Sequence, residues 1–483
     1  MASKKKLMTI LIIEILGISA IGFGLTEEYI QVPALIDLRT DSSDGAHTLE
    51  YLLKLAKKRG FSALFITDHH LQRLEYGIRP FQNILKKKVE KPGLRKEGTK
   101  NYLKKIELFS RKYPDVILIA GTESAPFYYW KGSYFKKDLT VCDWERHLLI
   151  FGLEKPEDYE KLPVLHNGYS IKHIFSLIGI SHLFLLLLLF FGLYLLRRKG
   201  IVKYSGMIIL VFSILLLLNN HPFKSSPYSQ YHGFQGISPY QLVIDYVNSK
   251  GGMVFWNHPQ TLSGRGRIGA ILKNTPPYPE VLVESRNYAG FAALYGDTIT
   301  VTEPGNIWDR VLREYCQGQR EKPVWGISAA DFHQEGGASD KLGNYPTIFL
   351  VKDKTKEDIL NALKKGRMYA SSGDIDLPRL ILEDFSISDS ESSRKGIQGE
   401  EIFSRGFSRI KIRVSDSCPG KNSLSLRLIR SGKLLQTFKG ESPLYIEFQD
   451  DFMEKGKKIY YRLDVEDEKG RKLVSNPIFV RFE

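Results

Sequence analysis

Short apolar runs that border acidic residues or histidines recur along this chain, and they constrain its fold more than any other feature. Seven such runs are expected to form strands: VPALIDL before Arg39, Asp41 and Asp44, SALFIT before Asp68, His69 and His70, VILIAGT before Glu123, HLLIFGL beginning at His147, GMVFWN before His258, VLV before Glu284, Ser285 and Arg286, and VWGISAA before Asp331 and His333. Apolar runs of this length are typical of buried strands.

Amphipathic helix patterns separate several of these runs. Their positions are Leu49, Leu52, Leu53 and Ala56 before Gly60, then Leu242, Val243, Tyr246 and Val247 between a Ser238 cap and Gly251, and finally Ile359, Leu360 and Leu363 between a Thr355 to Asp358 capping box and Gly366. Strands that alternate with helices favour parallel pairing, and closure of such a sheet predicts a β/α barrel. Barrel sites form at the carboxyl ends of strands, where these acids and histidines fall.

Six side chains are expected to meet at one edge of that sheet: His69, Glu123, His147, His258, Asp331 and His333. A single histidine or aspartate after a strand is more often a helix cap or a turn residue, so the prediction rests on the set. Converging imidazoles and carboxylates are costly unless cations compensate them, and a mixed nitrogen and oxygen set suits Zn²⁺, Mn²⁺ or Fe²⁺. Two or three such ions can hold a phosphoryl group and lower the pKa of a bound water.

The first run departs from this pattern. In LIDLRTDSSDG, residues 35–45, the apolar run breaks into Asp37 and ends in an Asp-Gly turn. Arg39 and Asp41 stand where a metal site of this kind should carry histidines. Read alone, the stretch fits a metal site, an altered metal site or a polar loop.

The order of the motifs resembles that of the polymerase and histidinol phosphatase (PHP) superfamily. The motifs that carry the resemblance are RTDSSDG, ITDHH, AGTES, RHLLIFGL, WNHP and AADFH, with GRMYASSG at residues 366–373 similar to the stretch that follows the last motif. They cover roughly residues 30–375 apart from an apolar insertion. The resemblance implies a distorted seven-stranded β/α barrel that binds two or three divalent metals and hydrolyses a phosphomonoester or phosphodiester.

Carried over by position, the resemblance implies one metal centre at Asp44, His69 and His333 and a second at Glu123, His147 and His258. The positions of the remaining centre are held here by Arg39, Asp41, Glu123 and Asp331. An arginine stays protonated and cannot ligate a metal. Arg39 is therefore expected to supply a fixed charge or to clamp a substrate phosphate, with Asp331 as a second catalytic residue.

Two further residues have alternative roles. Asp41 is expected to be either a metal ligand or an ion-pair partner of Arg39, and Arg286 either a phosphate contact or part of a surface ion pair. The alternative to an enzyme is a catalytically inactive PHP-like domain that binds a phosphorylated ligand, as a binding or sensor protein of the cell envelope.

Two apolar segments interrupt the barrel pattern and predict a transmembrane hairpin. Residues 174–196 are long enough to span a membrane, and residues 206–218 form a shorter run. The basic stretch RRKGIVK between them predicts a cytoplasmic turn, and residues 7–25 predict a signal peptide or a signal anchor. This topology places the barrel on the extracytoplasmic side of the cell membrane. The alternative is a buried helical hairpin of a soluble protein.

The pattern changes again near residue 381. Alternating short runs predict hairpins around Ser431–Gly432 and Lys469–Gly470 and an immunoglobulin-like, all-β sandwich. The predicted organisation is a signal segment over 1–28, a barrel over 29–172 and 221–380, a hairpin over 173–220 and the sandwich over 381–483.

Charge and cysteine content limit the partners. The net charge of +15 favours anionic partners, but the basic stretch 86–105 contains only Tyr102 as an aromatic residue. A phosphorylated small molecule or envelope component and the membrane are therefore the expected partners, and nucleic acid is not favoured. The three dispersed cysteines predict neither a zinc knuckle nor a disulfide framework.

Overall fold

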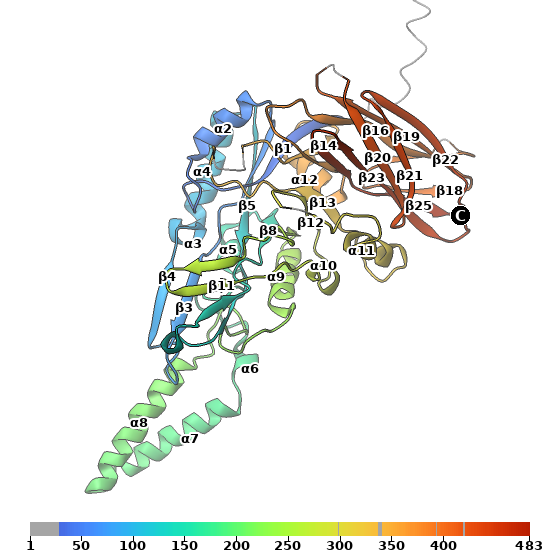
Figure 1. The fold of residues 1–483 in the computed structure, drawn as a ribbon. Helices are drawn as coiled ribbons and strands as arrows, with labels where there is room; N and C mark the ends of the chain where they lie inside the picture. The colour runs from blue at the N-terminus through green and yellow to red at the C-terminus, as the bar shows by residue number, and fades with distance from the viewer. Residues whose placement is uncertain (1–28, 298, 337–340, 393, 419–420) are drawn as a thin grey trace, which may run out of the picture.

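The computed structural model describes residues 29–297, 299–336, 341–392, 394–418 and 421–483, so the predicted signal segment lies outside the described residues. The chain is a mixed α/β protein (Figure 1). A large sheet forms its centre, an apolar helical hairpin projects from one end, and an all-β unit lies at the other.

Seven neighbouring strands of the large sheet carry the candidate site. In spatial order they are β13 (Trp325–Ser328), β12 (Gly290–Leu294), β9 (Met253–Trp256), β8 (Leu148–Phe151), β5 (Ile117–Ser124), β2 (Ala63–Ile66) and β1 (Ile30–Leu38). Adjacent strands are parallel except at β8, which runs antiparallel to both β5 and β9.

The two outer strands of this set are joined through the segment that follows β13. The Ala330 amide donates to the Ile36 carbonyl at 2.8 Å, and the Phe332 amide donates to the Asp37 carbonyl at 3.0 Å. The Arg39 amide donates in turn to the Phe332 carbonyl at 3.0 Å. The first and last motifs of the sequence are therefore neighbours. On its other side β1 pairs with the antiparallel strand β14 (Pro346–Val351), and β14 pairs in turn with the antiparallel strand β15 (Met368–Ser372).

Six of the seven strand predictions are confirmed, and the prediction for VLV is wrong. Those residues belong to α10 (Val281–Glu284), and the strand of this region is β12, with the sequence GFAAL. Glycine and alanine have low strand propensity, whereas VLV is rich in β-branched residues. Pairing with β9 and β13 on either side makes β12 a strand despite its composition.

The three predicted helices are present. Leu49, Leu52, Leu53 and Ala56 are the buried apolar face of α2 (Leu49–Lys58). In α12 (Lys356–Lys365) the Thr355 hydroxyl accepts from the Asp358 amide, and the helix ends at Gly366 in the left-handed conformation. The Ser238 cap is wrong, because Ile237 is the capping residue of α9 (Ser238–Ser249). The remaining helices of the body are α3 (Leu94–Glu97), α4 (Thr99–Lys112), α5 (Pro156–Glu160) and α11 (Ile307–Cys316).

The predicted apolar segments form α6 (Ile174–Leu177), α7 (Ile180–Leu195) and α8 (Ile201–Asn219), which leave the body as a hairpin (Figure 1). The two long helices touch at Gly192 and Gly206, where an added Cβ would lie 2.9 Å from the Leu210 nitrogen and 2.7 Å from the Leu195 Cβ. Among the described helices, α8 is the one long and apolar enough to cross a membrane, and α7 is shorter. Only 11% of the apolar stretch of α8 is buried within the protein, unlike the core helix of a soluble domain.

The hairpin enters and leaves the body at nearly one point. The Asn167 amide donates to the Ser225 hydroxyl at 3.0 Å, and this hydroxyl donates to the Val164 carbonyl at 2.7 Å. Smaller sheets flank this region: β3 (Arg73–Gly77) with β4 (Lys86–Glu90), and β6 (Tyr129–Lys131), β7 (Thr140–Cys142), β11 (Ile271–Asn274) and β10 (Arg265–Ile268) in another.

The C-terminal unit consists of ten strands around a second hydrophobic core. They are β16 (Leu380–Asp389), β17 (Lys395–Ile397), β18 (Glu401–Ser404), β19 (Ser408–Asp416), β20 (Ser423–Arg430), β21 (Lys433–Glu441), β22 (Leu444–Asp450), β23 (Lys458–Asp467), β24 (Lys472–Ser475) and β25 (Ile478–Phe482). Both predicted hairpins are confirmed, since β20 pairs with β21 and β23 with β24. Pairing of β15 with β24 joins this unit to the large sheet.

Candidate metal centre

Glu123, near the end of β5, lies at the middle of the candidate site. The parallel pairing of β2 with β5 continues past β2 as a bridge between His69 and Glu123. Because β8 is antiparallel, the residue before its first position, His147, lies at the edge where β5 and β9 end. The Asn257 amide donates to the His147 carbonyl at 3.1 Å and brings His258 to the same edge.

Glu123, His147 and His258 form a compact group of ligand atoms. Glu123 Oε1 lies 3.1 Å from His147 Nδ1 and 3.6 Å from His258 Nε2, and the two nitrogens are 3.3 Å apart. A tetrahedral ion with bonds of about 2.0–2.1 Å keeps its ligand atoms about 3.3 Å apart. The three donors therefore fit a divalent ion without rearrangement.

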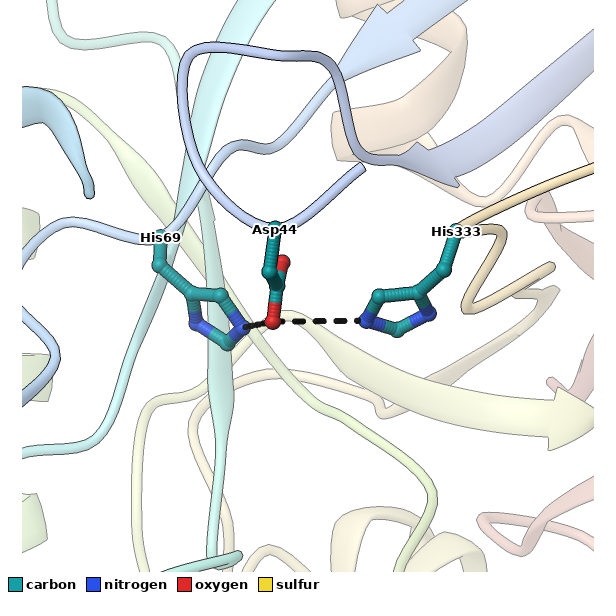
Figure 2. Close-up of side chains that lie close together, drawn as sticks. All are labelled: Asp44, His69 and His333. Carbon is teal, nitrogen blue, oxygen red and sulfur yellow. Dashed lines mark ion pairs between the residues drawn. The ribbon is translucent and has the colours of Figure 1, made fainter. Parts of the chain in front are cut away.

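Asp44, His69 and His333 form a second group (Figure 2). The two imidazoles flank the Asp44 carboxylate, with nitrogen to oxygen distances of 3.3 Å from His69 and 3.7 Å from His333. His69 Nδ1 is also 3.1 Å from Glu123 Oε2, so Glu123 contacts both groups, one oxygen to each. Gly45 must be a glycine, because a Cβ there would lie 2.5 Å from the Arg39 carbonyl oxygen.

Asp37, Glu123 and Asp331 form a third group of acidic oxygens, but a guanidinium lies among them. Arg39 NH1 is 2.5 Å from Asp37 Oδ1, and Arg39 NH2 is 2.5 Å from Glu123 Oε2 and 3.4 Å from Asp331 Oδ1. NH1 also donates to the carbonyl and the hydroxyl of Thr67, each at 2.7 Å. The third group does not fit a metal ion while Arg39 holds this position.

The cluster has a buried floor and an open side. Exposure of the side chains is 0% for Arg39 and 1% for Glu123, but 27% for Asp44, 39% for His333 and 44% for Asp331. A reactant can therefore approach from the side of Asp44, His333 and Asp331, and not from that of Arg39.

The charges of the cluster are strongly coupled. Burial raises the pKa of Glu123, but Arg39 and the neighbouring imidazoles outweigh burial and bring it well below its usual range. Burial lowers the pKa of His258, but the hydrogen bond with Glu123 and nearby carboxylates raise it to about 9. His333 has its pKa raised to about 9 against burial, chiefly by Asp44. A metal ion would replace protons held by these imidazoles, since an imidazole must be deprotonated to ligate.

Three residues of the cluster have a strained backbone. Asp37, His258 and Asp331 have φ values of 73°, 28° and 43° although none is a glycine. Such conformations cost of order 1–3 kcal/mol each and persist where the surrounding structure imposes them. All three lie at the edge of the sheet where the candidate ligands meet.

Two predicted site residues are not brought to the cluster. The Asp41 side chain is 47% exposed and pairs with Lys105 Nζ at 3.2 Å, because the loop after β1 turns it outward. Arg286 follows α10 rather than a strand, is 49% exposed, and lies 3.9 Å from Glu314. The predicted phosphate clamp at Arg39 also has no access, because its side chain is fully buried between protein acceptors.

Sequence reasoning missed Asp37 and Asn257. The Asn257 amide nitrogen donates to Asp37 Oδ2 at 2.7 Å and to Glu123 Oε1 at 2.6 Å, and so fixes both carboxylates. Each of the two residues directly follows a buried apolar run, which is the same pattern that predicts the ligands. Each also stands next to a stronger motif residue, so the pattern alone does not distinguish it. A cavity of about 1000 Å³ lies between β12 and the C-terminal unit, and no residue of the three ligand groups lines it.

Comparisons with known proteins gave structural neighbours only. No family model matches the chain, and no curated protein matches it. One solved structure is a two-domain protein from Bacteroides vulgatus that contains a predicted PHP-like metal-dependent phosphoesterase, with 12% identity and a TM-score of 0.38, covering 94% of this chain and 97% of that one. Another is a protein from Bifidobacterium adolescentis named as a putative metal-dependent phosphoesterase, with 16% identity and a TM-score of 0.29, covering 68% of this chain and 96% of that one.

Proposed function

We propose that this protein is a metal-dependent phosphoesterase with two metal sites on a distorted β/α barrel. The observation that carries the proposal is the position of Glu123, whose two oxygens face the two histidine-containing groups. Asp44, His69 and His333 would hold one ion, and Glu123, His147 and His258 the other. Zn²⁺, Mn²⁺ or Fe²⁺ bound there would supply Lewis-acid activation of water and neutralise charge on a phosphoryl group.

The chain's own residues have separate roles in this proposal. Asp331 is the acid on the open side of the cluster, and its carboxylate is oriented by Arg39 at 3.4 Å and by the strained backbone. It is placed to orient a water or to accept its proton. Arg39 is a positioning residue, which compensates Asp37, Glu123 and Asp331 in place of a third ion and does not contact substrate.

The test combines metal analysis with hydrolysis of an aryl phosphomonoester and an aryl phosphodiester in the presence of Mn²⁺ or Zn²⁺. We expect about two metal ions per chain and measurable turnover. His258→Ala should lose one ion and lower kcat by about 100-fold or more, since even partners of metal ligands contribute 10–100-fold. His232→Ala is the matched control, because His232 belongs to none of the three ligand groups. Fewer than one ion per chain in the wild type would contradict the proposal.

The second candidate is a binding or sensor protein without turnover. The observation that favours it is Arg39, which removes a metal position on which the family relies. The same assay separates the two, because a binding protein would retain two ions and bind a phosphate ester without hydrolysing it.

We further propose that α7 and α8 anchor the protein in the cell membrane with the cluster on the extracytoplasmic side. The supporting observations are the low burial of α8, its length and the basic stretch at the tip of the hairpin. A reporter active only in the cytoplasm, fused after Gly200 or after Glu483, tests this topology. Activity at Gly200 alone is expected, and activity at Glu483 would contradict the proposal.

A further inference from the structure

A cavity of about 210 Å³ lies at the base of the apolar hairpin. Its walls come from β3 and β4 and from the two chain segments that enter and leave the hairpin, residues 165–169 and 221–230. None of the residues that line it belongs to the three ligand groups of the metal centre. It is therefore a separate site.

The cavity carries an excess of positive charge. Its charged lining consists of Arg73, Lys86 and Lys224 against the single carboxylate of Glu75. Glu75 is nearly fully buried and is already paired, with Lys86 Nζ at 2.5 Å and Arg73 Nε at 2.8 Å. Arg73 Nε also lies 3.7 Å from Glu90, so Arg73 and Lys86 both have carboxylate partners and the charge that remains to be compensated is that of Lys224.

Lys224 is the cation that lacks a partner. It is half-buried, and no ion pair joins it to another residue in the described part of the chain. Burial and the nearby Lys86 lower the pKa of Lys224, so its charged form is disfavoured where it lies. An anion in the cavity would offset both the burial of Lys224 and the repulsion by Lys86, because it gives the desolvated ammonium a partner of opposite charge.

The position of the cavity defines where such an anion would come from. Asn83, in the turn between β3 and β4, makes two hydrogen bonds of 2.8 Å with Asn219 at the end of α8. Phe81 packs edge-on against Phe212 of α8, with ring centroids 5.6 Å apart. The same turn exposes Ile78 and Leu85, by 53% and 56%. The apolar surface of the hairpin therefore continues onto this turn, and the cavity, lined by Asn83 of the turn and by His221 just after α8, lies beside it.

We propose that this cavity binds the phosphate group of a membrane lipid, with Lys224, Lys86 and Arg73 as its ligands. The lipid source follows from the location, since a headgroup phosphate lies at the boundary where an inserted hairpin emerges from the hydrocarbon region. Charge-assisted hydrogen bonds from ammonium and guanidinium groups to phosphate are the interactions expected there. The inference rests on the proposed insertion of the hairpin into a membrane and is independent of the metal centre.

Native mass spectrometry of the full chain in neutral detergent tests the site. Phosphatidic acid, phosphatidylcholine and inorganic phosphate are titrated separately. We expect one tightly bound phosphatidic acid per chain and an affinity about tenfold lower for Lys224→Gln, with binding restored in Lys224→Arg. Lys199→Gln in the basic stretch at the tip of the hairpin removes the same charge elsewhere and should bind like the wild type.

Two results would overturn the proposal. Equal binding of phosphatidic acid by the wild type and Lys224→Gln would show that the lipid does not bind in this cavity. Binding of inorganic phosphate as tight as that of the lipid, with displacement of the lipid, would overturn the assignment to a headgroup. Insertion of the hairpin is read independently, from resistance of reconstituted protein to alkaline extraction, so failure of the site and failure of membrane anchoring are distinguishable.

Discussion

The guanidinium of Arg39 occupies the position of a cation among three carboxylates. Asp37, Glu123 and Asp331 approach it as they would a metal ion, and Thr67 accepts two further hydrogen bonds. A metal ion can exchange and can bind a substrate oxygen, whereas this guanidinium is fully buried and always charged. Arg39 therefore supplies the positive charge that these carboxylates need but cannot serve as a coordination centre.

Replacement of Arg39 by a ligand should restore that centre. We expect Arg39→His to bind about one more Mn²⁺ per chain than the wild type, measured by elemental analysis after gel filtration. In Arg39→Ala the three carboxylates lose their counter-charge, which should cost about 3–5 kcal/mol of unfolding free energy without metal. Added Mn²⁺ should recover much of that loss. Identical metal content in the wild type and Arg39→His would show that Arg39 does not hold a metal position.

His70 makes stability depend on pH. Its ring is fully buried, its Nε2 lies 2.8 Å from the Tyr159 carbonyl, and burial lowers its pKa from about 6.5 to about 3. The folded state therefore binds the proton more weakly than the unfolded state, so the stabilisation is complete above pH 6.5 and is lost as the pH falls from 6.5 towards 3. Below pH 6.5, unfolding free energy should fall by up to about 1.4 kcal/mol per pH unit from this residue.

Denaturant unfolding in detergent at pH 7.5, 6.0 and 5.0 measures this dependence. His70→Gln keeps an amide donor for the Tyr159 carbonyl and cannot be protonated, so its pH slope should be smaller than that of the wild type. Equal slopes for the two proteins would contradict the prediction.

At the scale of elements, the sequence predicted most of the strands and the helices with amphipathic faces. The buried faces of α2 and α12 follow from local spacing and caps, which act within one turn and can be read from neighbouring residues. The direction of β8 could not be read in this way. Its antiparallel course depends on pairing with β5 and β9, and only that course explains why His147 precedes its strand while the other ligands follow theirs.

For the candidate site too, features set by neighbouring residues could be predicted and features set by distant contacts could not. The histidines and Glu123 were predicted, because each stands beside an apolar run. The outward direction of the Asp41 side chain and the burial of Arg39 could not be predicted, since both depend on contacts with distant residues such as Lys105 and Asp331.

The contact between α7 and α8 should depend on two glycines. Gly192→Val and Gly206→Val would place side-chain atoms within 3 Å of the opposite helix, and overpacking of this kind typically costs about 1–3 kcal/mol. We expect a lower melting temperature in detergent for both variants. Gly179→Val is the matched control, because nothing lies within 4 Å of a Cβ there. An unchanged melting temperature in all three variants would contradict the observed helix contact.

At the scale of the whole molecule, the C-terminal unit and the large sheet share buried polar contacts as well as the pairing of β15 with β24. Arg462 in β23 is fully buried, and its Nε and NH2 donate to the two Asp309 oxygens in α11, each at 2.8 Å. The partners are 153 positions apart, and neither stands in a motif, so the sequence offered no sign of this junction.

Loss of this ion pair should destabilise both units together. Asp309→Ala leaves the buried Arg462 with Asp464, 2.7 Å away, as its remaining carboxylate partner among the described residues, and should cost about 3 kcal/mol. Arg310→Ala on the same helix removes an exposed guanidinium 3.3 Å from Glu314, which keeps Arg320 as a partner at 2.7 Å, and should cost no more than about 0.5 kcal/mol. Denaturant unfolding followed by tryptophan fluorescence and by circular dichroism should give one transition. Separate transitions for the two probes would contradict the coupling.

The hydrogen bonds from Asn167 through Ser225 to Val164 have a practical consequence. Because the chain returns to the body beside the point where it departs, the residues between could be exchanged for a short flexible bridge without pulling the strands apart. A chain that lacks residues 1–28 and in which a Gly-Ser segment replaces residues 170–223 should dissolve without detergent and keep the metal content of the intact protein. Attachment to a membrane and chemistry at the ligand cluster would then be separable properties of one polypeptide, free to be gained or lost independently.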